Sequence, residues 1–277
     1  MPMIRFNKKF VFILFLFPVP AFAQVPDSAR RIIHFEGTDN FRDIGGYKTR
    51  SGKHVRWGKI FRAGSLSALT DTDLQTLQKL SVACVVDLRT ITELANQPDH
   101  LPPNMQYLST RSLSDTADEN IIRDTFNFGN ADSALVDFYY NTSYFRIKYK
   151  PVFEALLDVN KDSSVVFHCS EGRDTAGFAA ALILYALGVD EKTIIQDYEI
   201  SNVSGSARNE RSVKWLISAY GISESRARRF ISSKPENLQT AFLSLCYQYG
   251  SVDKFLEIEM GLDKKNLDKL KTKYLDQ

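Results

Sequence analysis

Two short apolar runs constrain the fold of this chain more than any other feature of its sequence. They are VACVVDL at residues 82–88 and SVVFHC at residues 164–169. Near-continuous apolar residues without alternation are typical of strands buried on both faces, as in parallel sheets that helices cover. The second run is closely followed by AGFAAALILYALG, which is apolar on nearly all sides and has Gly188 where a helix C-cap needs it. We therefore expect an α/β fold, with a small, mainly parallel sheet flanked by helices and a helical C-terminal half.

Local patterns predict the other elements. Polar–apolar alternation over residues 40–64, on both sides of a turn at 50–53, predicts a β-hairpin. Thr70 predicts the start of a helix, because it is a good N-cap residue and Asp73 follows three residues later. The remaining expectations are an irregular insertion at 98–129 with one short strand near 105–108, helices over 131–158 divided at Pro151, and successive helices from Asp190 onward with breaks at Gly205, Gly221, Pro235, Gly250 and Gly261.

The N-terminal residues differ in composition from the rest of the chain. Basic residues precede an apolar run that ends in AFA before Gln24, which is the pattern of a secretory signal peptide. The run is interrupted by prolines and is shorter than the about 20 apolar residues of a membrane-spanning helix, although an uncleaved anchor is the alternative. We expect export to the periplasm or the medium, without stable membrane insertion. The expected division is a signal peptide at 1–23, a linker at 24–36 and a single domain at 37–277.

Charge and cysteine content narrow the function classes. The 277 residues include 35 basic and 33 acidic ones, so no strong overall field attracts nucleic acid. The three cysteines are an odd number, so at least one thiol is unpaired or pairs with another molecule. Cys84 and Cys246 have apolar neighbours and are expected to be buried, whereas Cys169 begins a polar loop. The histidines lack metal-ligand spacing, so we expect no metal and no other cofactor, and the oligomeric state stays open.

A strand that ends in a loop and leads into a helix forms an anion-binding site. The N–H groups of the loop point inward, and the helix N-terminus carries a partial positive charge. Cys169 stands at the start of such a loop, so we expect its sulfur beneath these N–H groups, where they favour the thiolate and lower its pKa. A thiolate in this position can attack the phosphorus of a bound phosphate ester and form a covalent intermediate.

The loop sequence HCSEGRDTAG at residues 168–177 resembles the signature HCxxGKDRTG of the Cys-based protein tyrosine phosphatases. The similar branch is the bacterial one that includes dual-specificity and phosphoinositide-active members. The resemblance continues in NFRDIGGY, GKIFRAGSLSALTDTDL, VVDLRTITELANQPD, ALGVDEKTIIQDYEISN and AFLSLCYQYGSVDKFL, and so spans nearly the whole mature chain. It implies a Cys-based phosphatase fold for the tyrosine-phosphatase-like domain at 37–277, a phosphocysteine intermediate, and a phosphorylated peptide or small phosphate ester as the bound partner.

The resemblance assigns a role to each matched loop position. It makes Cys169 the nucleophile, with His168 supporting its ionised state and Gly172 allowing the tight turn. Asp174 matches the acidic residue that protonates the leaving oxygen, and Arg173 keeps a cation near the substrate where the family has Lys. The other matched positions, all expected in the substrate-binding loop, are Ser170, Glu171, Thr175, Ala176 and Gly177.

Two of these positions depart from the family pattern. Thr175 stands where the family has its phosphate-clamping Arg, and Ala176 where it has a Ser or Thr that bonds to the leaving thiolate. A guanidinium grips two phosphate oxygens and stabilises the transferring group, whereas Thr offers one neutral hydroxyl. We expect Arg173 to compensate in part. Three arginines of other matched segments are candidates either for substrate contact or for structural ion pairs: Arg42, Arg62 and Arg89.

Three functions stay open at this point. The first is an active phosphatase for phosphotyrosine, a phosphoinositide or a sugar phosphate. The second is a weakened enzyme that binds phosphorylated ligands and turns them over poorly, because Thr175 cannot clamp the transition state. The third is a rhodanese-like sulfurtransferase, which also uses a cysteine-headed loop after a strand. The matched segments outside the loop favour the phosphatase.

Overall fold

The structure of the protein is a computed structural model that describes residues 28–110 and 145–276. The expected signal peptide at 1–23, the first residues of the expected linker, and the part of the insertion and of the following helix within 111–144 lie outside the described residues. The helices inside the described ranges are all too short or too polar to cross a bilayer.

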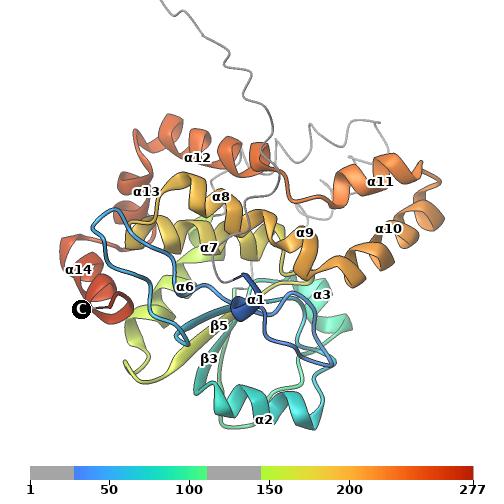
Figure 1. Cartoon of the computed structure of the whole chain (residues 1–277), viewed down its shortest axis with the longest axis horizontal. Coiled ribbons are helices and arrows are strands. Elements are labelled where there is room, and N and C mark those ends of the chain that lie inside the picture. Colours follow the sequence, from blue (N-terminus) through green and yellow to red (C-terminus); the bar gives the residue numbers. More distant parts are fainter. Residues whose placement is uncertain (1–27, 111–144, 277) are drawn as a thin grey trace, which may run out of the picture.

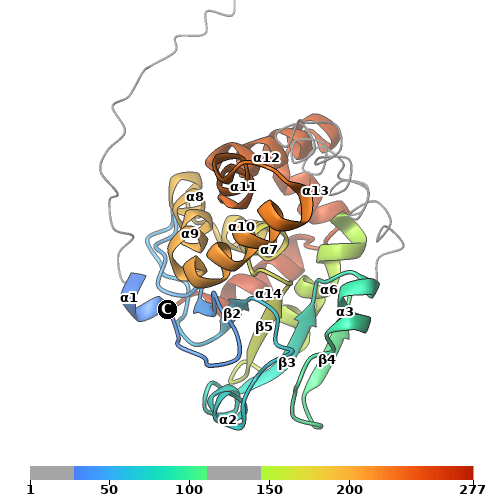
Figure 2. The ribbon, with the colours of Figure 1, turned by 90° about the vertical axis from the view of Figure 1, so that its right-hand side faces the viewer.

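Five strands in the described ranges form one sheet in the order β1-β2-β5-β3-β4. β1 runs antiparallel to β2, and the other neighbouring strands are parallel. Figure 2 shows β2, β5, β3 and β4 side by side in this order. The mainly parallel sheet is therefore confirmed, and β3 and β5 are the two apolar runs. The strand bounds are Arg42–Asp43 for β1, Ile60–Ala63 for β2, Val82–Asp87 for β3, Gln106–Ser109 for β4 and Ser164–His168 for β5.

Helices cover both faces of the sheet, which explains why the central strands are apolar without alternation. On one face, Phe61 of β2 and Val166 of β5 belong to a buried cluster with Leu77 of α2. On the other face, Ile60 and Phe167 belong to the larger cluster formed with the C-terminal helices. Figure 1 shows the sheet between α2 on one side and α7, α8 and α12 on the other.

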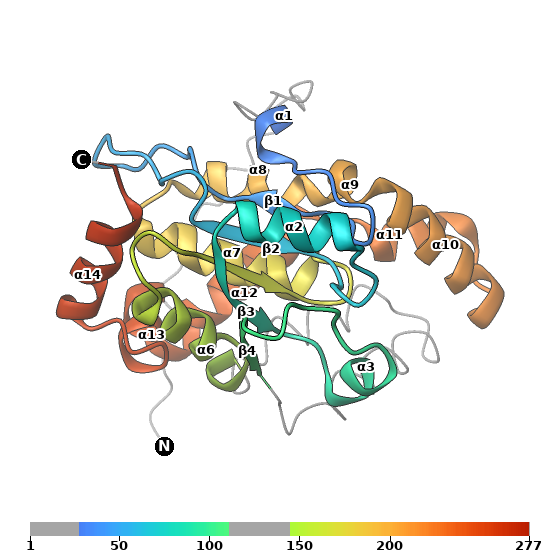
Figure 3. The same ribbon diagram turned by 90° about the horizontal axis from the view of Figure 1, so that it is seen from below.

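The helical C-terminal half is also confirmed. Figures 1 and 3 show α10 and α11 at one end of the molecule and α13 and α14 at the other. The helix bounds are Ser28–Arg31 for α1, Asp71–Lys79 for α2, Ile91–Asn96 for α3, Phe145–Asp158 for α6, Asp174–Leu187 for α7, Glu191–Glu199 for α8, Ser201–Ser204 for α9, Ser206–Tyr220 for α10, Glu224–Ile231 for α11, Pro235–Tyr249 for α12, Val252–Ile258 for α13 and Lys264–Tyr274 for α14.

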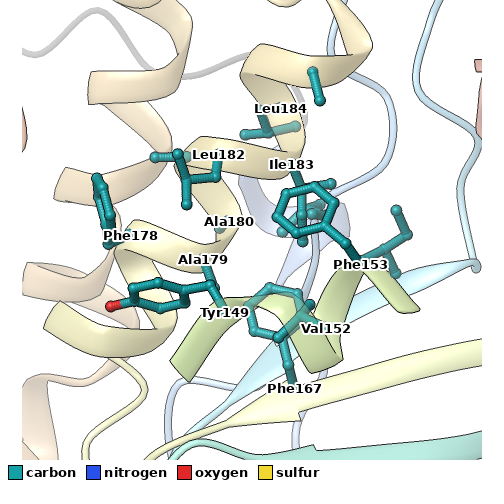
Figure 4. Close-up of a cluster of buried hydrophobic side chains, with 14 of the residues drawn as sticks. Tyr149, Val152, Phe153, Phe167, Phe178, Ala179, Ala180, Leu182, Ile183 and Leu184 are labelled. Carbon is teal, nitrogen blue, oxygen red and sulfur yellow. The ribbon is translucent and has the colours of Figure 1, made fainter. Parts of the chain in front are cut away.

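The main core lies between α6, α7 and β5 (Figure 4). The rings of Tyr149 on α6 and Phe178 on α7 meet edge to face, with their centroids 5.3 Å apart. The expected break at Pro151 is wrong, because α6 continues through this residue. Proline removes one helical hydrogen bond, and the buried side chains of Tyr149, Val152 and Phe153 on both sides of it hold the helix against the core.

Three local predictions in the first half of the chain are confirmed. The hairpin turns as expected, with the Thr49 N–H donating to the Lys53 carbonyl at 2.8 Å. Thr70 caps α2 in a full capping box with Asp73. The short strand expected near residues 105–108 is β4.

The cysteines differ in their surroundings. All three cysteines of the chain are free thiols, and Cys84 is buried as expected. Cys246 is exposed, so the prediction for this residue is wrong. Its neighbours Leu245 and Phe242 are buried on α12, whereas Cys246 lies on the outer side of the same helix.

Candidate active site

The loop that begins with Cys169 lies at the carboxyl end of a central strand. β5 ends at His168 and α7 begins at Asp174, so residues 169–173 form the connection, which we call the Cys169 loop. β5 lies between β2 and β3, and ligand sites of open α/β sheets lie beyond the carboxyl ends of such strands. Gly172 has a φ of 63°, and a Cβ atom there would lie 2.6 Å from backbone atoms of Ala63. Only glycine allows this close turn against β2.

The sulfur of Cys169 lies among backbone N–H groups. Those of Ala176, Glu171 and Arg173 are close enough to favour its thiolate form, and the side chain is buried. Burial raises the pKa of the Cys169 thiol above its usual value, and the three N–H groups oppose this rise. The expected placement of the sulfur is therefore observed, but the expected net lowering of its pKa is wrong. The loss of water around the sulfur outweighs the stabilisation that the amides give to the thiolate.

A buried arginine holds the carbonyl side of the loop. Arg62 Nη2 donates to the carbonyl oxygens of Gly172 at 2.9 Å and Arg173 at 3.0 Å. Its Nη1 donates to Asp197 Oδ2 at 2.8 Å. Arg42 lies on the other side of the same carboxylate, with its Nε 3.6 Å from Asp197 Oδ1. Both guanidinium groups are fully buried, and these contacts favour the structural alternative over substrate contact.

Asp197 thus links two buried cations to the loop. It also accepts a hydrogen bond of 2.9 Å from the hydroxyl of Tyr47. Burial alone would raise the pKa of Asp197, but the charges of Arg42 and Arg62 outweigh this effect and lower it. The expectation that Asp197 fastens a helix to the loop agrees with these contacts, since α8 carries Asp197 and Arg62 bridges it to the loop.

His168 is the last residue of β5 and lies over a second buried ion cluster. Its Nε2 is 2.9 Å from Asp99 Oδ2 and 3.7 Å from Asp87 Oδ1. Arg89 Nη2 lies 2.7 Å from Asp87 and 2.8 Å from Asp99. Burial would raise the pKa of Asp87, but the charge of His168 and the hydrogen bonds from Arg89 and Tyr107 lower it to about 2. This cluster fixes the ring of His168 directly beside the nucleophile.

The same cluster has donor atoms that a metal ion could use. One atom each from Asp87, Asp99 and His168 lie within 4.8 Å of one another. The guanidinium of Arg89 forms ion pairs with both carboxylates and supplies the positive charge there. Arg89 Nη1 also donates to the Gln97 carbonyl at 2.7 Å. The contacts of Arg89 therefore favour a structural role over substrate contact.

Arg173 and Asp174 lie where α7 begins. Arg173 Nε donates to Asp174 Oδ2 at 3.0 Å, and the Tyr198 hydroxyl donates to Asp174 Oδ1 at 2.6 Å. The Arg173 side chain is only 7% exposed, and its Nη1 is buried without a hydrogen-bond partner among the described residues. A buried guanidinium N–H without a partner is costly unless a ligand satisfies it. Arg173 is therefore the cation of the loop that is best placed to receive an anion.

The side chains at the mouth of the loop bond to other elements. Ser170 donates from its hydroxyl to a carboxylate oxygen of Glu93 on α3. Glu171 accepts a hydrogen bond of 2.9 Å from Arg208 Nε on α10. A cavity of about 510 Å³ lies alongside, lined in part by Arg208 and by Ser65, whose N–H donates to the Ser170 carbonyl at 3.1 Å. Ser170 and Glu171 thus position α3 and α10 around an open space beside the loop.

The first turn of α7 holds the two positions that depart from the family pattern. Thr175 is partly exposed and Ala176 is buried. A Cβ atom at Gly177 would lie 2.7 Å from the ring of Tyr198 and 3.0 Å from Arg62 Nη2. Gly177 therefore acts through close packing between α7 and its neighbours, and its place in the sequence signature has a steric reason.

A sequence profile described as "Tyrosine phosphatase family" matches residues 33–276. The chain belongs to the tyrosine phosphatase family. Among its curated relatives, a Cupriavidus necator protein provisionally named a tyrosine-protein phosphatase is 25% identical over 90% of both chains. The triple specificity protein phosphatase PtpB of Mycobacterium tuberculosis is 30% identical over 61% of this chain and 68% of its own. The family resemblance is thereby confirmed over residues 33–276, which include the Cys169 loop.

Two solved structures are also similar to this chain. The crystal structure of P. aeruginosa TpbA has 17% identity and a TM-score of 0.33, and the match covers 65% of this chain and 89% of TpbA. A complex of a TpbA variant with phosphotyrosine has 15% identity and a TM-score of 0.32, with the same coverage. Scores this low do not establish a shared fold on their own.

Several residues of this tyrosine phosphatase site were not found by sequence reasoning. They are Asp99, which binds His168, Glu93, which binds Ser170, and Arg208, which binds Glu171. Asp99 and Glu93 both lie in the matched segment VVDLRTITELANQPD, so their presence there was a signal without an assigned role. Arg208 lies outside the matched segments, and its position relative to the loop depends on helix packing.

Proposed function

We propose that this protein hydrolyses phosphate monoesters, foremost phosphotyrosine in proteins, through a phosphocysteine intermediate. The observation that carries this proposal is the free thiol of Cys169 among the inward-facing N–H groups of Glu171, Arg173 and Ala176. Such a cradle holds the oxygens of a phosphate group and faces its phosphorus toward the sulfur. Membership of the tyrosine phosphatase family supports the same chemistry.

In the first step, the thiolate of Cys169 attacks phosphorus while the bond to the leaving oxygen breaks. The leaving oxygen takes the electron pair and receives a proton from Asp174. In the structure both carboxyl oxygens of Asp174 accept hydrogen bonds, one from Arg173 and one from Tyr198. One of these two hydrogen bonds must therefore break when Asp174 carries the proton. In the second step, water gives a proton to Asp174 and attacks phosphorus, the sulfur–phosphorus bond breaks, and inorganic phosphate leaves.

The first test is hydrolysis of an aryl phosphate by the mature protein. We expect Cys169→Ser to abolish turnover and Cys246→Ser to leave it unchanged, because Cys246 is exposed on α12 and serves as the matched control. Acid quenching during turnover should trap one phosphoryl group on Cys169, detectable by mass spectrometry. Absence of hydrolysis by the unmodified protein over about pH 5–8 would refute the proposal, and so would hydrolysis by Cys169→Ser.

The weakened, ligand-binding alternative has a specific observation in its favour. Thr175 replaces the clamping Arg of the family signature, and loss of one such electrostatic donor costs on the order of 10²–10³ in rate. The variant Thr175→Arg with Ala176→Thr separates the two proposals. A gain in kcat of that order indicates a decayed enzyme, whereas an unchanged kcat indicates that the native loop already stabilises the transition state.

Substrate and location are proposals that rest on the sequence. The resemblance to phosphoinositide-active members makes a phosphoinositide the second substrate to test, in parallel with a phosphotyrosine peptide. The N-terminal pattern supports export, so the mature chain should begin at or near Gln24 when the full sequence is expressed. N-terminal sequencing of the exported protein tests this, and a mature form that retains residues 1–23 would contradict it.

A further inference from the structure

A second cavity, of about 760 Å³, has a strongly basic lining. No residue of the Cys169 loop lines it. It lies between the β-hairpin, the C-terminal residues and α8, and Figure 3 shows the hairpin beside the C-terminal end of the chain. We call it the hairpin cavity.

The charges around this cavity are unbalanced. Lys48, Arg56 and Lys59 line it and are at least partly exposed. The single carboxylate in the lining, Asp276, is paired with His54 at 3.3 Å. Backbone carbonyls accept hydrogen bonds from Arg56 Nε and Lys59 Nζ, and these contacts leave the charges uncompensated.

A buried cation forms the inner wall. Arg31 is 1% exposed and lies with its guanidinium carbon 3.7 Å from the centroid of the Tyr47 ring and 4.8 Å from that of Trp57. Its Nη1 donates to the carbonyls of Asp43 and Gly45, while its Nε is buried without a hydrogen-bond partner among the described residues. Burial raises the pKa of Asp43, and the charge of Arg31 is one of the effects that oppose this rise, so part of the Arg31 charge is balanced inside the protein. The unpaired N–H of a buried guanidinium is the feature that a bound anion would satisfy.

From these observations we propose that the hairpin cavity binds a small polyanion that carries phosphate or carboxylate groups. Guanidinium groups can donate two parallel hydrogen bonds to the oxygens of a phosphate or a carboxylate. The flanking lysine ammonium groups add positive charge and can contact an anion from several directions. The rings of Tyr47 and Trp57 give the cavity an apolar wall, which suits an anion with an organic body.

The cavity is joined to the catalytic loop by a short hydrogen-bond path. Tyr47 lines the cavity and donates from its hydroxyl to Asp197. Asp197 accepts from Arg62, which in turn donates to the carbonyls of Gly172 and Arg173. An anion that moves Tyr47 therefore acts on the groups that hold the loop. The binding proposal itself does not depend on phosphatase activity, and the experiment below measures binding.

Trp57 provides the reporter for this experiment. The chain has two tryptophans, so Trp215→Phe leaves Trp57, at the cavity, as the only source of tryptophan fluorescence. Pyrophosphate and citrate are titrated at constant ionic strength, with chloride as the reference. We expect a saturable change in Trp57 emission with half-saturation at about 1 mM or below for at least one of the two anions. Which of them binds more tightly distinguishes a phosphate ligand from a carboxylate ligand.

Two controls test whether the change in Trp57 emission comes from binding in the hairpin cavity. The double variant Lys48→Gln, Arg56→Gln should raise the anion concentration at half-saturation by about tenfold or more. Lys53 is an exposed residue of the same hairpin outside the lining, and Lys53→Gln should leave this concentration unchanged. Alkylation of Cys169 in a Cys246→Ser background should leave the response intact. The proposal is overturned by a response that does not saturate, that survives in the double variant, or that disappears when Cys169 is blocked.

Discussion

Replacing Asp197 by Asn tests whether the Cys169 loop is held by a buried ion cluster. The carboxylate of Asp197 lies 2.8 Å from Arg62 Nη1 and 3.6 Å from Arg42 Nε, and both arginines are fully buried. At an effective dielectric constant of 20, each pair of unit charges about 4 Å apart attracts by about 4 kcal/mol before the cost of burial. Asn keeps the shape of the side chain but leaves two buried cations without a counter-charge.

The expected loss of unfolding free energy follows from the two buried positive charges that remain without a carboxylate. Removing one partner of a buried ion pair typically destabilises a protein by about 3–5 kcal/mol, and Asp197→Asn should lie in that range. For a domain of this size, about 2–4 °C of melting temperature corresponds to each kcal/mol, so the melting temperature should fall by about 6–20 °C. The assay is urea unfolding and thermal melting of the protein that begins at Gln24.

The control is Asp268→Asn, which removes an exposed carboxylate from α14. It should change the free energy of unfolding by less than about 0.5 kcal/mol. If Asp197→Asn costs less than about 1 kcal/mol, the two arginines are not held by a buried carboxylate and the account of how the loop is anchored fails.

Three further predictions concern the loop and the cluster beside His168. Gly172→Ala should reduce kcat/KM by at least about 10²-fold, since the new Cβ would lie 2.6 Å from the backbone of Ala63; an active variant would show that the loop can shift without loss. Asp99→Asn should cost about 3 kcal/mol of unfolding free energy in urea. The cost should be smaller once His168 is already Gln, because His168 lies 2.9 Å from Asp99, although the contact of Asp99 with Arg89 remains; equal costs in both backgrounds would exclude the pairing with His168. The folded-state pKa of Asp87, about 2, lies below its ordinary 3.8, so its contribution to stability is complete above about pH 4 and is lost as the pH falls toward 2. In Asp87→Asn, the free energy of unfolding should therefore depend less steeply on pH between about pH 4 and pH 2. An unchanged slope would contradict the lowered pKa.

The sheet and the loop were predictable because they depend on local sequence. The runs that became β3 and β5 are apolar throughout, and burial on both faces requires this. Gly172 and Gly177 are matched by the family signature, and the structure gives each a steric reason. Thr70 and Asp73 encode their helix cap within four residues.

What the sequence could not show is which charges pair across the fold. Arg42, Arg62 and Arg89 were equally suited to a phosphate or to a carboxylate, and only the tertiary packing brings Asp197 to Arg42 and Arg62 and brings Asp99 to Arg89. The sign of the Cys169 pKa shift was missed for a related reason. Backbone N–H groups can be inferred from a loop motif, but the depth of burial that opposes them depends on the whole tertiary structure.

These pairings leave Arg173 as the main candidate to replace the missing Arg at position 175. Arg42, Arg62 and Arg89 bond to carboxylates and carbonyls, although the Nε atoms of Arg42 and Arg62 also lack a hydrogen-bond partner among the described residues. Arg173 differs because it belongs to the Cys169 loop itself, and its terminal Nη1 is buried without a hydrogen-bond partner among the described residues. If Arg173 holds the phosphate, Arg173→Gln should lower kcat/KM by about 10²–10³ in the native loop.

A double-mutant cycle decides whether this replacement has occurred. In the Thr175→Arg, Ala176→Thr background a second guanidinium is available, so the same Arg173→Gln change should cost about tenfold or less. The thermal stability of each variant serves as the control, because Arg173 also bonds Asp174 and its loss could loosen the start of α7. The guanidinium introduced by Thr175→Arg can hold the phosphate in place of Arg173, but it cannot replace the contact between Arg173 and Asp174. An equal loss of kcat/KM in both backgrounds would therefore mean that Arg173 acts only by positioning Asp174.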